Sequence, residues 1–268
     1  MVNSLLKVKN VNKIFNEATA DEKIALNDID LLLAPGDFVT IIGSNGAGKS
    51  TLMSTISGAL TPDIGDISIN EKIVTKLPEY KRSKYIGRVF QDPMAGTAPN
   101  MTIEENLAIA YSRKKNRGLR NAINRRRKDF FIESLQMLGL NLESRLSAKV
   151  GLLSGGERQA LSLLMATFTK PDILLLDEHT AALDPSRAEI ITNLTKNLVA
   201  KDQLTTLMVT HNMQQALDLG NRLIMMDKGQ IILEVGPDKK PYLTIDDLMS
   251  EFQRIRGEKM VSDRALLS

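Results

Sequence analysis

The sequence predicts an α/β fold: a largely parallel sheet with crossover helices, an inserted all-helical sub-domain and an N-terminal antiparallel β region. Three observations support this prediction. Residues 38–42 are β-rich and lead through a glycine-rich loop into a helical pattern that ends at Gly58. Strand and helix patterns then alternate, which indicates parallel strands joined by helices. Residues 173–176 are wholly apolar, as in strands buried between two layers of helices.

The N-terminal part is rich in strand patterns, which have alternating apolar residues or end at turn signals such as Pro35-Gly36. The strand-like segments are residues 5–11, 23–33, 66–74 and 85–90. Together with the glycine-rich loop and its helix, they make up the first part of the expected sheet core, residues 1–91.

The middle of the chain changes character. Thr102 and Glu105 have the spacing of a helix capping box, in which each side chain bonds a backbone N–H at the other position. Residues 128–138 place apolar side chains at helical spacing, and helical signals continue to about Thr169. We therefore expect an all-helical sub-domain at residues 92–169.

The last third returns to alternating strand and helix patterns. The expected elements are a helix from Pro185, strands at residues 205–209 and 223–226, a hairpin turn at 227–229 and a final helix at 244–255. The sheet core thus resumes at residues 170–240. A C-terminal helical segment, residues 241–268, completes a single domain.

The composition is that of an ordinary globular chain of 268 residues, with 43% apolar and 25% charged residues. The absence of cysteine excludes a disulfide framework, a thiolate metal site and a cysteine nucleophile, and the presence of only two histidines argues against a multi-histidine metal site. No signal-peptide pattern or membrane-length apolar run is present, so we expect a soluble, cytoplasmic protein. Residues 113–128 hold nine basic and no acidic residues, so the basic charge is local.

The glycine-rich loop fits the phosphate-loop pattern G-x4-G-K-[ST] between a predicted strand and a predicted helix, and so predicts the sheet core of a P-loop NTPase. Its residues are Gly43, Ser44, Asn45, Gly46, Ala47, Gly48, Lys49, Ser50 and Thr51. Glycines let backbone N–H groups curl round phosphate oxygens, and the following helix adds its positive N-terminal dipole. Lys49 would reach the β- and γ-phosphates, and Ser50 would bind Mg²⁺.

Two carboxylates follow the apolar strand. Asp177 and Glu178 stand at its carboxyl end, where ligands bind in open α/β sheets. Beside a phosphate loop, Asp177 would hold Mg²⁺ through water, and Glu178 would orient and deprotonate an attacking water. Two solvated acids at a strand end are the alternative, and the phosphate loop decides against it.

Residues 153–159 read Leu-Ser-Gly-Gly-Glu-Arg-Gln. Ser154 and Glu157 have the spacing of a second capping box, which would begin the helix that runs to Thr169. The heptapeptide as a whole resembles the signature motif of ABC (ATP-binding cassette) ATPases, and its chance occurrence is below about one in a million at average composition. The resemblance spans nearly the whole chain, because the motifs of that family follow one another in order.

The resemblance implies an ATPase that binds ATP and Mg²⁺ and works as a homodimer, head to tail around two ATP molecules. In that family the signature of one subunit faces the ATP held by the other. Ser154 and the Gly155 and Gly156 amides would therefore contact the γ-phosphate across the dimer, where a helix N-terminus favours an anion. Gln91 matches the glutamine loop, which contacts Mg²⁺ and the transport partner.

Further positions also match the family. His211 matches the switch histidine that contacts the γ-phosphate, with a surface histidine as the alternative. Asp184 matches a dimer-contact aspartate and would also cap the helix from Pro185. Phe15 is expected to stack on adenine, with a place in the core as the alternative. His179 stands where the family usually has proline, and we assign it a structural or tuning role. The expected catalytic residues are Lys49, Glu178 and His211.

A single cassette, without a long heptad region or a membrane span, favours a separate ATPase subunit of a bacterial transporter. Residues 91–106 and 177–185 resemble ATPase subunits of importers paired with lipoprotein-type binding proteins, several assigned to tryptophan or tyrosine uptake. We therefore expect a chain that powers import of an amino acid or other small solute. It would lie on the inner face of the cell membrane. Its expected partners are an integral-membrane permease and, indirectly, an extracellular substrate-binding protein.

The alternative is a soluble ABC ATPase that acts on nucleic acid or the ribosome. Only the basic residues 113–128 support it. A solvated helical face near anionic lipid headgroups or a partner loop is the simpler interpretation of that stretch. A regulator without turnover is a third possibility, and the presence of both Glu178 and His211 argues against it.

Overall fold

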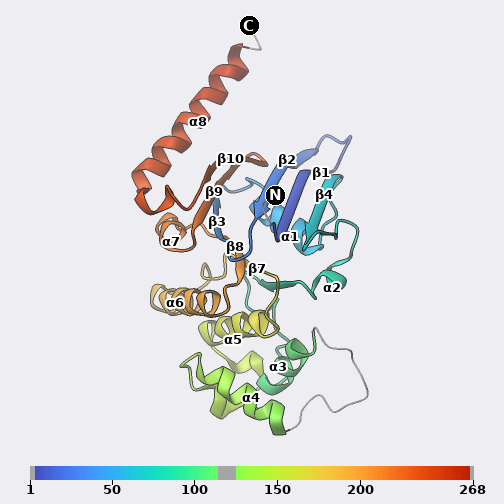
Figure 1. The fold of residues 1–268 in the computed structure, drawn as a ribbon, viewed down its shortest axis with the longest axis vertical. Coiled ribbons are helices and arrows are strands. Elements are labelled where there is room, and N and C mark those ends of the chain that lie inside the picture. Colours follow the sequence, from blue (N-terminus) through green and yellow to red (C-terminus); the bar gives the residue numbers. More distant parts are fainter. Residues whose placement is uncertain (1–3, 114–124, 266–268) are drawn as a thin grey trace.

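A six-stranded sheet forms the centre of the computed structural model, which describes residues 4–113 and 125–265 (Figure 1). The strands lie in the order β10-β9-β3-β8-β7-β6. They are β3 (Phe38–Gly43), β6 (Ile86–Val89), β7 (Ile173–Asp177), β8 (Thr205–Val209), β9 (Arg222–Asp227) and β10 (Gln230–Val235). All neighbours pair in parallel except β10, which is antiparallel to β9. The largely parallel sheet predicted from the sequence is confirmed.

Strand β7 shows why this sheet lies inside the molecule. Successive side chains of a strand point to opposite faces. Ile173 and Leu175 belong to one hydrophobic cluster, and Leu174 and Leu176 belong to another. All four side chains are fully buried, so both faces of the strand are covered, as its wholly apolar sequence predicts.

A second, antiparallel sheet has the order β2-β1-β4-β5 and confirms the predicted N-terminal β region. Its strands are β1 (Leu6–Phe15), β2 (Lys23–Leu33), β4 (Ile64–Ile69) and β5 (Lys72–Ile73). Helix α1 (Lys49–Ser57) packs with both sheets, because its Leu52 and Ile56 share a buried cluster with Val8 of β1 and Val39 of β3. This packing fixes the start of α1 beside the N-terminal sheet.

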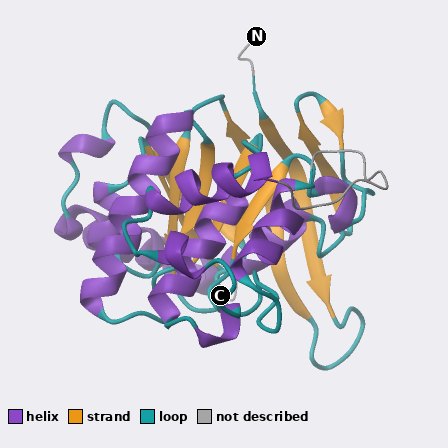
Figure 2. Ribbon diagram, turned by 90° about the horizontal axis from the view of Figure 1, so that it is seen from below, coloured by secondary structure: helices purple, strands orange, loops and turns teal. Residues whose placement is uncertain are grey.

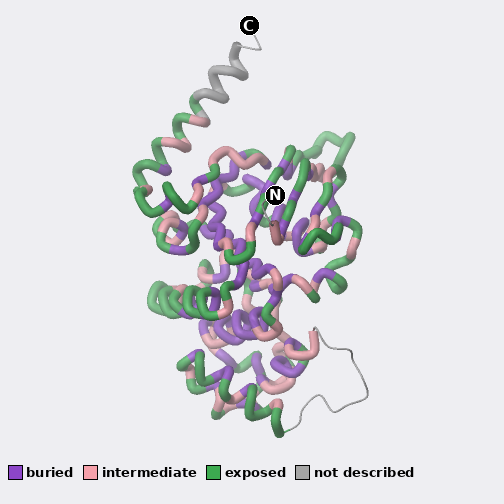
Figure 3. Tube along the Cα trace, viewed as in Figure 1, coloured by how far each residue is buried: buried purple, intermediate pink, exposed green. Residues whose placement is uncertain are grey.

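The helices of the middle segment lie together below the sheets in Figure 1, and Figure 2, seen from below, shows helices in front of the strands. The described part of the middle segment contains α3 (Ile103–Tyr111), α4 (Arg125–Gln136), the 3-10 turns η1 (Leu142–Arg145) and η2 (Val150–Leu152), and α5 (Gly155–Thr167). Together with α6 (Pro185–Asp202), their apolar sides share one cluster with Leu174 and Met208 of the sheet. Figure 3 shows α5 as largely buried, whereas much of α4 and α6 is exposed.

Two strand boundaries differ from the prediction. The single strand expected at residues 66–74 is split, because Asn70 and Glu71 adopt left-handed φ angles of 49° and 63° and turn the chain between β4 and β5. The strand expected at residues 5–11 continues to Phe15, where its last residues still pair with β2. Pairing with β2 therefore extends this strand beyond the residues whose alternating apolar pattern predicts a strand.

Three helices also depart from the prediction. Helices α2 (Glu79–Arg82) and α7 (Met213–Asp218) were not predicted, since each is too short to display a helical period. The final helix, α8 (Ile245–Ala265), continues well beyond residue 255. Its Leu248 is buried in a cluster with β9, β10 and α7, and the rest of the helix extends away from the sheets (Figure 1). Over residues 4–113 and 125–265, no helix combines the length and apolar character needed to cross a membrane.

Candidate functional site

The glycine-rich loop lies between β3 and α1, as predicted. Its conformation requires glycine at two positions. A Cβ at Gly43 would lie 2.2 Å from the backbone oxygen of Met226, and Gly48 has a φ of 99° with a Cβ position 2.4 Å from the Ala25 oxygen. The backbone can therefore approach its neighbours closely and turn tightly, as a loop that cradles phosphate oxygens must.

Lys49 is the first residue of α1, and only 5% of it is exposed. Its ammonium donates to the backbone oxygens of Gly43, at 2.8 Å, and Ser44, at 3.0 Å. Burial lowers the pKa of Lys49 from its ordinary value, while the carboxylates of Glu178 and Asp177 oppose the shift. The lysine thus lies within the loop, close to two acids that come from a distant part of the sequence.

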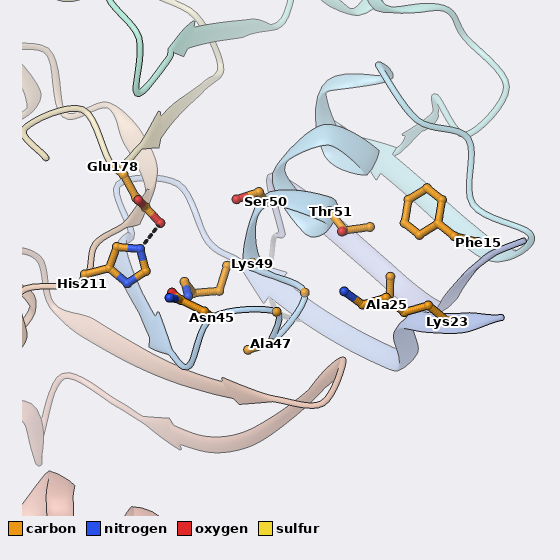
Figure 4. Close-up of a pocket in the computed structure, with 12 residues that line it drawn as sticks. Phe15, Lys23, Ala25, Asn45, Ala47, Lys49, Ser50, Thr51, Glu178 and His211 are labelled. Atoms are coloured by element: carbon orange, nitrogen blue, oxygen red, sulfur yellow. Dashed lines mark ion pairs between the residues drawn. The ribbon is translucent and has the colours of Figure 1, made fainter. Parts of the chain in front are cut away.

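One pocket gathers the loop with residues of the N-terminal sheet and with two residues that follow β7 and β8 (Figure 4). Its lining residues are Phe15, Lys23, Ala25, Asn45, Gly46, Ala47, Gly48, Lys49, Ser50, Thr51, Glu178 and His211. Phe15 is half-buried at the end of β1 and belongs to none of the hydrophobic clusters, so it lies in the pocket wall rather than in the core. A partly exposed aromatic ring at the edge of a phosphate loop suits a nucleobase.

Glu178 and His211 meet at the other end of this pocket. His211 Nε2 lies 2.6 Å from Glu178 Oε1, and the two residues follow the neighbouring strands β7 and β8. The Glu178 side chain is 10% exposed and that of His211 is 45% exposed. Glu178 also has a left-handed φ of 48°, a conformation that costs about 1–2 kcal/mol for a residue with a side chain. Strain at a carboxylate beside a phosphate loop is typical of a functional position.

Asp177 ends β7 and is bonded by an arginine that sequence reasoning missed. Arg88 Nη2 lies 3.4 Å from Asp177 Oδ2, and its guanidinium also donates to the hydroxyls of Ser57, at 3.1 Å, and Ser54, at 3.3 Å. The guanidinium stands 4.6 Å from the centre of the Phe90 ring. Arg88 therefore joins the strand before Gln91 to α1 and to the predicted metal-binding acid. A charged residue inside a predicted strand was the available signal.

Lys23 is the second residue that the sequence did not single out. It opens β2 and lines the pocket between Phe15 and the loop (Figure 4). No motif contains it, because its place depends on how the N-terminal sheet packs against the loop. It adds a second lysine to the pocket that already holds Lys49.

The signature residues lie elsewhere. Ser154 caps α5 through the predicted capping box: its N–H donates to Glu157 Oε2 at 2.7 Å, and its hydroxyl accepts from the Glu157 N–H at 3.3 Å. Gly155 and Gly156 form the first turn of that helix. Ser154 and Gly156 line a second pocket beside Arg187 of α6, apart from the pocket around Lys49. One chain therefore carries the two motifs in separate places.

The two remaining predicted positions lie outside the Lys49 pocket. Gln91 is exposed, two residues after the end of β6. Asp184 caps α6, since its Oδ1 accepts from the Arg187 N–H at 3.1 Å, and Pro185 is the first helical residue. The predicted capping role of Asp184 is thereby confirmed. Within the described residues, no group of three or more histidine, aspartate or glutamate side chains forms a metal centre of its own.

His179 is buried beneath the site and does not enter it. Only 1% of the residue is exposed, and its Nε2 lies 2.9 Å from the hydroxyl of Thr195. That hydroxyl donates to the Ile191 oxygen, so Nε2 carries the proton and donates to it. Burial lowers the pKa of His179 to about 4. A buried neutral histidine supports the structural role assigned to it.

The arrangement has clear relatives among known proteins. Residues 26–181 match the ABC transporter family model. The chain is 41% identical to the "Tyrosine transport ATP-binding protein" of Clostridioides difficile (strain R20291), an alignment that covers 93% of this chain and 99% of that protein. It is 33% identical to the "Energy-coupling factor transporter ATP-binding protein EcfA2" of Clostridium tetani (strain Massachusetts / E88), over 91% of this chain and 83% of that protein.

Solved structures agree with the sequence comparison. The dimeric structure of a post-hydrolysis state of the ATP-binding cassette MJ0796 bound to ADP and Pi has a TM-score of 0.74 to this chain, with 31% identity. The match covers 87% of this chain and 98% of MJ0796. The family match, the identity to full-length relatives and the shared fold lead to one conclusion. The chain belongs to the ABC transporter family and is its ATP-binding cassette, an ATPase.

Proposed function

We propose that this ATPase powers a membrane importer of an amino acid or another small solute. The observation that carries the proposal is the 41% identity over nearly the full length of a tyrosine transport ATP-binding protein. Relatives named for spermidine/putrescine import and for xylose/arabinose import are about equally similar to this chain, at 33% and 32% identity, and so widen the class of solutes. Amino-acid import is therefore the first cargo class to test.

In the proposed site, Lys49 and the backbone of residues 43–51 hold the phosphates, and Phe15 stacks on adenine. Glu178 orients and deprotonates the attacking water, and His211 contacts the γ-phosphate. The contact of 2.6 Å between Glu178 and His211 supports this assignment, because it brings a base and a phosphate contact together at one end of the pocket. Lys49 provides the positive charge that the transferred phosphoryl group requires.

The donor set also suits Mg²⁺. The residues that would hold the ion are Ser50, Asp177 and Gln91, whose side chains offer a hydroxyl, a carboxylate and an amide oxygen. Mg²⁺ bound with phosphates typically uses only one or two protein carboxylates and fills its remaining positions with water and phosphate oxygens. When bound, the ion would neutralise charge on the phosphates. The absence of a larger acidic cluster among the described residues fits this pattern.

The working unit that we propose is a head-to-tail homodimer. Ser154, Gly155 and Gly156 of one chain would contact the ATP bound by Lys49 of the other, and Asp184 would lie at the dimer contact. Two observations support this arrangement: the signature lies outside the Lys49 pocket, and the similar cassette MJ0796 is dimeric with ADP and Pi.

Further partners would be an integral-membrane permease and, indirectly, an extracellular substrate-binding protein, with the chain peripheral on the inner face of the membrane. A similar solved cassette, cbiO1 of Clostridium perfringens, is described as part of the ABC transporter complex cbiONQ; it is 25% identical, with a TM-score of 0.73. We assign residues 1–91 and 170–240 to the ATP-binding core, 92–169 to the helical sub-domain and 241–268 to the C-terminal helix. Most of the basic stretch 113–128, which motivated the nucleic-acid alternative, lies outside the described residues.

The substitution Glu178→Gln tests the catalytic assignment. It preserves the shape of the side chain and removes the base, so ATP should still bind while turnover falls by at least about 100-fold. The variant should then accumulate as a dimer with MgATP. Gel filtration with MgATP, alongside phosphate release, measures both effects.

The matched control is Glu189→Gln, which changes an exposed acid on α6. It should keep wild-type turnover and elute as the wild type does. Hydrolysis at the wild-type rate by the Glu178→Gln protein would contradict the role of Glu178. A Glu178→Gln protein that binds ATP and stays monomeric would contradict the proposed dimer.

A further inference from the structure

A groove behind the Glu178–His211 contact holds a glutamine that belongs to none of the sequence motifs. Gln215 lies in α7, one turn after His211, and is half-buried. It lines the same groove as Glu178, Thr180, Thr192 and His211. The loops that carry Glu178 and His211 therefore meet again around this one side chain.

The side chain of Gln215 bonds three separate segments. Its Oε1 accepts from the hydroxyl of Thr210 at 2.6 Å, directly before His211. Its Nε2 donates to the hydroxyl of Thr192 in α6 at 2.8 Å. The same Nε2 lies 3.4 Å from the hydroxyl of Thr180, two residues after Glu178. One amide thus links the loop of His211, the loop of Glu178 and the helix between them.

The bonding around the amide fixes its orientation. The Thr192 hydroxyl donates to the Ala188 oxygen at 2.8 Å, so it accepts from Gln215 and requires a donor there. The Thr210 hydroxyl donates to Gln215 and accepts from the Asn212 N–H at 3.1 Å. Gln215 itself is held at the start of α7, where its N–H donates to Asn212 Oδ1 at 2.9 Å. Each hydrogen bond of the Gln215 amide with Thr192 and Thr210 therefore pairs one donor with one acceptor.

We propose that Gln215 is a positioning residue for hydrolysis. Its side chain holds the loop of His211 in a fixed position relative to the loop of Glu178, because it bonds both loops and also α6. Misplacing a reacting group by about 1 Å costs up to about 100-fold in rate, so a side chain that spans both loops controls turnover without touching ATP. The inference rests on the proposed roles of Glu178 and His211.

The experiment compares Gln215→Ala with Gln214→Ala in the full chain. Gln214 is the matched control because it is the adjacent residue, is exposed, and bonds only Asp218 of its own helix among the contacts described, at 2.8 Å. The measured quantities are kcat and KM for MgATP and the melting temperature. Gln215→Ala should lower kcat on the order of tenfold and change KM by less than about twofold, because the proposed contacts of Phe15, Lys49 and the phosphate loop to ATP remain.

A spectroscopic measurement separates positioning from general loosening. The chain has only two histidines, so ¹⁵N-labelled histidine gives one set of ring signals for His211 and one for buried His179. Gln215→Ala should move or broaden the ring signals of His211 and leave those of His179 in place. Gln214→Ala should leave both sets unchanged.

A double-mutant cycle with Thr192→Val tests the anchoring helix. Valine keeps the shape of threonine and cannot accept from Gln215. If the two residues act through one bond, the double variant should have the kcat of Gln215→Ala within about twofold. Multiplicative losses of kcat would show independent effects and overturn the proposal. So would a kcat of Gln215→Ala equal to that of Gln214→Ala, or unchanged His211 signals.

The Glu178→Gln variant tests the catalytic site independently of the role of Gln215. Full activity of Glu178→Gln would remove the basis of both proposals. An inactive Glu178→Gln protein combined with wild-type turnover of Gln215→Ala would overturn the role of Gln215 alone.

Discussion

His179 directly follows Glu178, yet its ring points into the interior. Its imidazole is neutral there, because burial lowers the pKa to about 4 from an ordinary value of 6.5. The unfolded chain binds a proton at this residue below about pH 6.5, whereas the folded chain resists protonation until about pH 4. The stability that depends on a neutral His179 is therefore complete above pH 6.5 and is lost as the pH falls towards 4.

We predict that this residue makes the protein acid-sensitive. Between pH 7 and pH 5 it should remove about 2 kcal/mol from the free energy of unfolding. His179→Gln should flatten the dependence over this range, because glutamine still donates to Thr195 and does not titrate. Urea unfolding of both proteins at each pH measures the difference. Parallel pH profiles for the two proteins would show that the titration of His179 does not contribute.

At the scale of residues, the sequence predicted the site residues that lie next to one another along the chain and missed those that are brought together only by folding. The loop that ends in Lys49 and Ser50 is a single run of chain, so its local pattern is enough to identify it. Lys23, Arg88 and Gln215 come from three different elements and meet the site only through packing. No spacing rule in the sequence connects them with the loop, and they emerged only from the structure.

At the scale of elements, a buried arginine closes the C-terminal end of α1. Arg82 is 1% exposed, and its guanidinium donates to four backbone oxygens. They are those of Thr55, at 2.8 Å, Ile56, at 2.9 Å, Thr75, at 2.7 Å, and Leu77, at 2.9 Å. The first two are carbonyls at the end of α1 that have no partner within a helix. Arg82 thus joins the helix of the phosphate loop to the chain that enters β6.

We predict that Arg82→Lys destabilises the protein by at least about 2 kcal/mol, because a single ammonium cannot reach all four oxygens. The melting temperature should fall by about 5 °C for a chain of this size. Lys81→Met is the control, since Lys81 is exposed on the same short helix, and it should melt like the wild type. Equal melting temperatures for both variants would mean that the four bonds contribute little net stability.

The elements that the sequence predicted well are those with a strong pattern of their own. Strands β2 and β8 were predicted with the observed ends: β2 stops just before the Pro35-Gly36 turn signal, and β8 is a short run of five β-branched or apolar residues. The break at Asn70 was missed, since asparagine and glutamate adopt left-handed φ angles without a sequence signal as clear as glycine. Helices α2 and α7 were missed because so few residues show no period.

At the scale of the whole molecule, the segment after Gln91 presents an apolar side chain to solvent. Met94 is 40% exposed, and its sulfur accepts from Arg158 Nη1 at 2.9 Å. The segment connects β6, whose Arg88 pairs with Asp177, with the helical part of the chain. An exposed methionine in a segment that reaches both parts suits a docking surface for a membrane partner.

We predict that Met94→Asp abolishes permease binding and transport while the isolated subunit keeps its ATPase activity. The melting temperature should change by less than about 2 °C, because a charge at an exposed position carries no burial cost. Ile109→Asp is the control, since Ile109 is 51% exposed and belongs to α3 rather than to this segment. Pull-down of the permease and thermal unfolding of each variant measure the two effects. A destabilised Met94→Asp protein that still binds the permease would contradict the prediction.

The separation of the signature pocket from the Lys49 pocket has a kinetic consequence. In the proposed head-to-tail dimer, one chain carries halves of two different sites and cannot complete either of them alone, so we expect its rate of turnover in dilute solution to rise with the square of its concentration. A permease that held two copies side by side, as proposed, would replace that encounter with an effective concentration in the millimolar range. We therefore expect ATP hydrolysis mainly where a transporter has been assembled, with little turnover by free subunits in dilute solution.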